Sequence, residues 1–193
     1  MKSVILAALC LAAPIFAQSK QEIGLTLGRL GGSDRGPVSL DSGTAFQANY
    51  GIRLAGGEKA ALFGEVHFLA SPQRLVTAAS RNATRDVASL YVTPGIRVKF
   101  WPTARVQPYV AAGGGLAVYE HSTLNLAGST NAAPRTANTG AFTYGGGVDV
   151  PVLKWFGLRF EVRDFVTGSP VYNVPVNGRQ HNVVTGGGVT LRF

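Results

Sequence analysis

The chain is poor in cysteine and histidine, and beyond its N-terminal segment it has no long uninterrupted apolar run. Cys10 is its one cysteine. Because Cys10 lies in an N-terminal apolar segment, the chain after it can form neither a disulfide nor a cysteine-based catalytic or metal site. The histidines are His67, His121 and His181, and no two of them share a metal-binding spacing. Beyond the N-terminal segment, glycine, proline and charged residues interrupt every apolar run before it reaches the roughly 20 residues of a spanning helix.

The N-terminus has the composition of a secretory signal. Lys2 gives a basic start, an apolar run too short for a membrane anchor follows, and Ala17 is a small residue at a plausible cleavage point. A lipoprotein signal at Cys10 is disfavoured, because a leucine precedes it where such signals have a small residue. We therefore predict a signal peptide over residues 1–17 and one exported domain over residues 18–193, placed in the periplasm, the medium or the outer membrane.

The rest of the sequence shows eight stretches in which apolar residues recur at every second position, as in β-strands. Long and short connections alternate between them, beginning with a long one. Pro94 lies inside the fourth stretch, where it removes a ladder hydrogen bond, so we expect a bulge at Pro94–Gly95. The stretches are Gln21–Leu30, Thr44–Leu54, Ala60–Leu69, Val87–Phe100, Arg105–Tyr119, Gly140–Val150, Trp155–Val166 and Asn182–Phe193.

The charged residues of these stretches lie almost entirely on one face. Burying that many ions in a soluble core would cost several kcal/mol for each ion that is not paired. The less costly arrangement is a closed barrel whose apolar face points outward and whose lumen holds the charges as ion pairs. The residues predicted to form this network are Arg53, Glu65, Arg97, Lys99, Asp149, Arg159, Glu161, Arg163 and Arg192. They could form a lumen gate, but a fixed plug of ion pairs is the favoured interpretation.

The last stretch alternates apolar and small or polar residues and ends on Phe193. With the alternating connection lengths, this pattern resembles the bacterial outer-membrane β-barrel family, in particular its small OmpA/OmpX-like members. The resemblance implies an all-β fold, an eight-stranded antiparallel transmembrane up-and-down barrel. It also implies that the barrel-assembly machinery reads Phe193 as a signal. Eight strands enclose a lumen that side chains can fill, so no water-filled pore and no cofactor are expected.

Two other functions are consistent with the sequence. Lipid A-modifying hydrolases exist on small barrels, and Glu120-His121-Ser122 has suitable residue types, but it falls at a strand-to-loop corner where neighbouring side chains diverge. His67 has no serine at the spacing such enzymes use. A soluble periplasmic barrel that binds a hydrophobic ligand is the second alternative. We predict no catalytic residue and favour a structural or surface-interaction role.

The net charge of +8 favours an anionic partner. Export argues against nucleic acid, and the basic residues are spread rather than patched with aromatic residues. Arginines in the expected outer loops are suited to contact anionic lipopolysaccharide instead, and the barrel is expected to be a monomer. These arginines are Arg74, Arg81, Arg85, Arg135 and Arg179.

Overall fold

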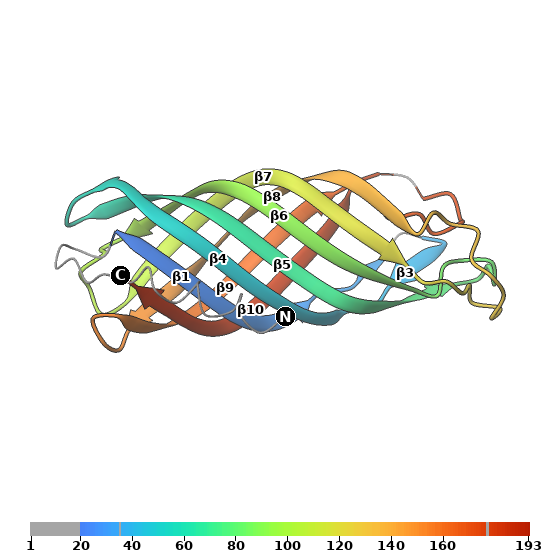
Figure 1. The fold of residues 1–193 in the computed structure, drawn as a ribbon, viewed down its shortest axis with the longest axis horizontal. Coiled ribbons are helices and arrows are strands. Elements are labelled where there is room, and N and C mark those ends of the chain that lie inside the picture. Colours follow the sequence, from blue (N-terminus) through green and yellow to red (C-terminus); the bar gives the residue numbers. More distant parts are fainter. Residues whose placement is uncertain (1–19, 35, 177) are drawn as a thin grey trace, which may run out of the picture.

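The computed structural model describes residues 20–34, 36–176 and 178–193, so the predicted signal peptide lies outside the described residues. Eight long antiparallel strands form a closed ring with the order β1-β4-β5-β6-β7-β8-β9-β10, and β10 pairs with β1 (Figure 1). The predicted all-β, eight-stranded barrel is therefore confirmed. The long strands are β1 (Gln21–Leu30), β4 (Gly43–Gly56), β5 (Ala60–Ala78), β6 (Asp86–Phe100), β7 (Gln107–His121), β8 (Thr136–Pro151), β9 (Phe156–Thr167) and β10 (Gln180–Arg192).

The first long connection contains a small hairpin, β2 (Ser33–Asp34) and β3 (Val38–Leu40), which the sequence did not indicate. β3 pairs with the outer part of β5, which continues to Ala78 although the third stretch was expected to end at Leu69. Pro72 made this segment resemble a loop, but a register shift between Ser71 and Arg74 accommodates it and pairing resumes beyond. The barrel therefore extends further on its loop side than the period-2 pattern indicates.

The bulge expected at Pro94–Gly95 is absent. The β6–β7 ladder keeps one register on both sides of Pro94, from Val92 opposite Leu116 to Gly95 opposite Gly113. Two pairings are missing between these points, one of them at Pro94, which has no N–H to donate. The physical effect of the proline is a short gap in the ladder rather than an inserted residue.

Inward-facing glycines allow the neighbouring strands to approach closely. A Cβ atom added to Gly188 in β10 would overlap the backbone of Leu25 in β1, and one added to Gly115 would overlap the backbone of Val92. The closure of the ring is completed at its inner end, where the backbones of Gln21 and Phe193 exchange two hydrogen bonds of 3.0 Å each. Without a Cβ at these positions, the strands can bend as sharply as a small barrel requires.

The outer wall is a band of exposed apolar side chains, with aromatic residues at its short-turn end and charged residues at its loop end. At the end with short turns, Trp101, Trp155 and Phe193 are each more than half exposed. At the loop end, outward charges appear at Arg29 and Glu120. No helix in the described part of the chain is long and apolar enough to cross a membrane. The exposed band includes Leu25, Leu27, Phe46, Phe68, Ile96, Val110, Leu116, Phe142, Leu158, Phe160 and Val162.

We expect a charge on this wall to destabilise the barrel in a bilayer. Phe160→Arg should lower the free energy of unfolding by about 2–4 kcal/mol, because the guanidinium would lie in hydrocarbon. Chemical denaturation of the protein refolded into lipid vesicles measures this free energy. Val152→Arg is the control: Val152 is as exposed as Phe160, at 55% against 57%, but lies in a short turn. Equal, small effects at both positions would mean that the wall faces water.

Candidate functional site

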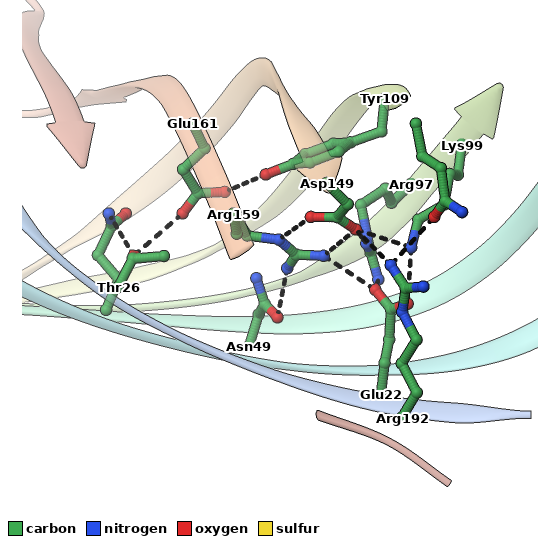
Figure 2. A network of polar contacts seen from close by, with 12 residues as sticks. Glu22, Thr26, Asn49, Arg97, Lys99, Tyr109, Asp149, Arg159, Glu161 and Arg192 are labelled. Atoms are coloured by element: carbon green, nitrogen blue, oxygen red, sulfur yellow. Dashed lines mark hydrogen bonds and ion pairs between the residues drawn. The ribbon is translucent and has the colours of Figure 1, made fainter. Parts of the chain in front are cut away.

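The half of the lumen nearer the short turns, called its inner part below, holds a network of buried ions, shown in Figure 2. Arg159 of β9 lies at its centre and is fully buried. Its guanidinium donates two hydrogen bonds to Asp149, of 2.7 and 2.8 Å, and reaches across the lumen to Glu22 at 2.9 Å and Asn49 at 2.8 Å. Asp149 is the cross-strand partner of Arg159, so the strand register itself places this pair. The geometry is a bidentate pair, the strongest form of an arginine–carboxylate contact.

Glu22 of β1 is a shared acceptor for cations from two other strands. Lys99 of β6 lies 2.7 Å from Glu22 and 2.7 Å from Asp149, and Arg97 of β6 also contacts the Glu22 carboxylate. Arg97 also forms an ion pair with Glu65, with 2.7 Å between Nε and Oε2, although the angles of this contact are not those of a hydrogen bond. Its guanidinium lies over the ring of Phe63, 4.8 Å from the centroid, so the cation has both charge and π contacts.

A second group of ions lies next to the first. Arg163 of β9 donates to Glu65 at 2.6 Å and to Glu161 at 3.1 Å. Glu161 also accepts from the Tyr109 hydroxyl at 2.8 Å. Because Glu65 contacts both Arg97 and Arg163, it joins the two groups into one network.

The charges of this network balance. Its carboxylates are Glu22, Glu65, Asp149 and Glu161, and its cations are Arg97, Lys99, Arg159 and Arg163, which is four against four. Each carboxylate has a cation and each cation a carboxylate, so this network contains no uncompensated charge. Breaking any of these buried pairs would cost free energy, so the network holds the lumen closed. Because its charges cancel, it has no excess charge of one sign to attract ions from solution.

The structure brings seven of the nine predicted lumen residues into this network and places the other two at its inner mouth. Arg192 lies 3.8 Å from Asp149 and donates to Gln107 at 3.0 Å, with its side chain 12% exposed. Arg53 is half-buried and lines a cavity of about 300 Å³ together with Glu22 and Lys99. Arg53 and Arg192 therefore lie at the inner mouth of the lumen, beside the balanced group, and Arg192 contacts it through Asp149.

Glu22 is the member that the sequence analysis missed. It lies on the same face of the first stretch as Gly24 and Thr26, and the alternation places this face inward. The same parity rule that selected Glu65 would have found it.

The outer part of the lumen is filled differently, by an apolar and aromatic cluster. Tyr91, Tyr119 and Phe165 are buried there; the rings of Tyr91 and Phe165 lie 5.0 Å apart and the Tyr119 hydroxyl bonds to Thr167 at 2.6 Å. Tyr172, from the last long connection, joins the same cluster. Aromatic side chains and loop residues thus close the lumen a second time.

Arg74 belongs to this outer layer and not to the loop surface where it was predicted. It is 1% exposed and donates to Asn182 at 2.9 Å and to the backbone oxygens of Asp41 at 3.0 Å and Gly31 at 2.6 Å. The extension of β5 turns this side chain inward, where it joins three segments. Arg74 is therefore unable to contact a surface partner.

The histidines do not meet a nucleophile among the residues that the structure describes. His121 interacts with the Pro134 carbonyl at 2.8 Å and accepts from the Val171 N–H at 3.0 Å, while the neighbouring Ser122 donates to the Leu124 carbonyl. His67 pairs with Gln47 at 3.2 Å. Over residues 20–34, 36–176 and 178–193, no group of histidine, cysteine and acidic residues could hold a metal ion. The residues His121 and Ser122 therefore do not form the arrangement that the hydrolase alternative requires.

Removing one charge from the balanced network should destabilise the barrel strongly. Glu22→Gln leaves Arg97, Lys99 and Arg159 with one buried carboxylate fewer, at a cost of about 3–5 kcal/mol in the free energy of unfolding. Denaturant titration of the vesicle-bound protein measures it. Glu120→Gln is the matched control, since its pair with Arg135 is exposed and is worth at most about 1 kcal/mol. If the two substitutions had the same effect, the lumen pairs would not hold the barrel together.

The two contacts of His121 predict that the outer loops loosen in acid. His121 lies at the end of β7, next to the exposed Glu120, and is therefore outside the apolar band. Burial lowers the pKa of His121 below its ordinary 6.5, so the folded state favours the neutral ring that accepts from Val171. This contribution to stability is complete above pH 6.5 and is lost as the pH falls through the lowered pKa.

Limited proteolysis of the connections 122–135 and 168–179 tests this expectation. Cutting should be faster at about pH 5 than at about pH 8, and His121→Leu should be cut equally at both. His181→Gln is the control: it also replaces a histidine, but one whose ring contacts Asp164 rather than a loop backbone, so the variant should still be cut faster at about pH 5 than at about pH 8. Wild-type cutting that did not change with pH would contradict the expectation.

The comparisons with known proteins agree with this architecture. The model of the outer membrane protein beta-barrel domain family matches residues 3–193. No curated protein matches the chain. Among solved structures, the chain is similar to neisserial surface protein A, with 15% identity, a TM-score of 0.60 and coverage of 91% of this chain and 98% of that one.

Two further structures show the same fold. OprG from Pseudomonas aeruginosa has 17% identity and a TM-score of 0.55, covering 91% of this chain and 97% of that one. Ail from Yersinia pestis has 12% identity and a TM-score of 0.54, covering 90% and 99%. These identities carry the fold alone, whereas the family model spans almost the whole sequence. The chain belongs to the outer membrane protein beta-barrel domain family and is a protein of the bacterial outer membrane.

Proposed function

We propose that this protein is a closed, non-conducting barrel that stabilises the envelope and displays its outer loops, without a catalytic activity. The observation that carries the proposal is the doubly filled lumen: a balanced ion network in its inner part and an aromatic cluster in its outer part. A pore would need a continuous row of hydrated, incompletely paired groups. The buried pairs act as a fixed plug and give the ring its rigidity.

The outer loops are the surface that this scaffold presents. Connections 122–135 and 168–179 are held to the barrel by His121, and the backbone N–H of Thr84 bonds to the carbonyl of Tyr172 at 3.1 Å. These contacts fix one loop against another and favour a defined recognition surface. Arg81, Arg85, Arg135 and Arg179 are exposed there, so an anionic surface such as lipopolysaccharide is the proposed partner.

We assign the C-terminal strand a second partner, the barrel-assembly machinery. Phe193 is 52% exposed and lies at the inner end of the β1–β10 seam, where the ring closes. A strand whose last aromatic side chain stays accessible is suited to recognition before closure. The barrel is proposed to act as a monomer, because every long strand already has two neighbours.

The closed lumen predicts the electrical behaviour of the protein. Reconstituted into a planar lipid bilayer, the wild type should give no stable current steps, because paired ions and aromatic side chains occupy the conduction path. A porin inserted at the same protein-to-lipid ratio is the positive control. The fraction of folded protein is checked by its altered gel migration before heating. Reproducible current steps from folded wild-type protein would overturn the non-conducting role.

A further inference from the structure

The lipid-facing wall is not uniform. A groove of about 600 Å³ runs over β10, β1, β4 and β5. Its floor is formed where small residues replace bulky ones on the outward face: Gly187, Ala48 and Ala70. The strand register places these among large apolar neighbours, which form its sides: Leu25, Leu27, Phe46, Phe68, Leu90 and Val189.

A polar notch of about 450 Å³ lies directly on the loop side of this groove. Arg29 and Thr44 are the next outward residues beyond Leu27 and Phe46 on the same two strands, and they pair with each other. Ser42 and Gln73 complete the notch. The apolar groove therefore ends at the pair Leu27 and Phe46, and the next outward pair, Arg29 and Thr44, already belongs to the polar notch.

Arg29 lacks the carboxylate partner that two other arginines at this rim have. Arg85 faces Asp86 and Arg135 faces Glu120. Arg29 instead hydrogen-bonds to the neutral hydroxyl of Ser42. No carboxylate of the described residues lies within ion-pair distance of it. Its positive charge is available to an anion.

We propose that the groove and notch together bind one lipid of the outer leaflet, the phosphorylated lipid anchor of lipopolysaccharide. One acyl chain lies in the groove and a phosphate lies against Arg29. The groove reaches from the middle of the wall towards its loop end, where it meets the notch, and this end faces the outer leaflet when the short turns face the periplasm. An apolar channel capped by an unneutralised arginine matches an amphiphile with an anionic head. The site uses only the outward face of the wall, so it stands or falls separately from the closed lumen.

Native mass spectrometry of the full chain refolded in detergent tests the proposal, with purified bisphosphorylated lipid A as the probe. The wild type should retain one lipid A. Arg29→Gln should weaken binding roughly tenfold, as expected for the loss of a charged hydrogen bond. The same substitution should not affect binding of dephosphorylated lipid A. Ala48→Phe, which fills the groove between Leu25 and Phe68, should weaken binding of both lipids.

Matched substitutions elsewhere on the barrel serve as controls. Ala112→Phe places the same ring on the far wall, between Ile96 and Tyr144, and should bind lipid A like the wild type. Arg105→Gln removes an exposed cation in the short turn between β6 and β7, at the opposite end of the barrel from the loops, and should also have no effect. Gel migration before and after heating confirms that each variant is folded.

Three results would overturn the proposal. Equal retention of lipid A by all variants would show that it binds only as part of a general lipid shell. Phosphatidylglycerol retained as tightly as lipid A would make a phospholipid the occupant. A dimer of the chain that disappears with Ala48→Phe would make the groove a contact between two copies.

Discussion

The rest of this structure depends on one constraint: a lipid bilayer offers no hydrogen-bond partner to the backbone of a strand. The eight strands satisfy it by forming a ring without an edge, with Gln21 and Phe193 completing the last rungs. Once the ring is closed and its outside faces hydrocarbon, every charged side chain within the band must point inward. The lumen is too narrow to hydrate them, so they pair with one another.

The balance of four carboxylates against four cations is the consequence of that confinement. Some of these pairs join strands that are not neighbours: Arg159 of β9 reaches Glu22 of β1, and Arg163 of β9 reaches Glu65 of β5. The ladder holds adjacent strands and the ion pairs hold opposite walls. The loops, anchored by Arg74 and His121, close the outer end over this frame.

Period-2 alternation predicted the strands and their faces well, because side-chain direction in a strand is a local property. Parity placed Arg97, Asp149 and Arg159 on one face, and the cost of burying unpaired ions assigned that face to the lumen. Arg74 was misplaced because its burial depends on the pairing of β5 with a distant hairpin. The contact between His121 and Val171 was equally beyond prediction, since it joins loops separated by 50 positions. Local pattern specifies the wall, and long-range contacts specify what covers its outer end.

The central claim, that the apolar face meets lipid, can be tested with the two natural tryptophans. Trp101 and Trp155 are both 57% exposed and lie at the short-turn rim of the wall. In vesicles made with brominated lipids, their fluorescence should be quenched most by bromines near the lipid carbonyls and least by bromines near the chain ends. Fluorescence that is indifferent to every brominated lipid would show that the wall does not contact the bilayer.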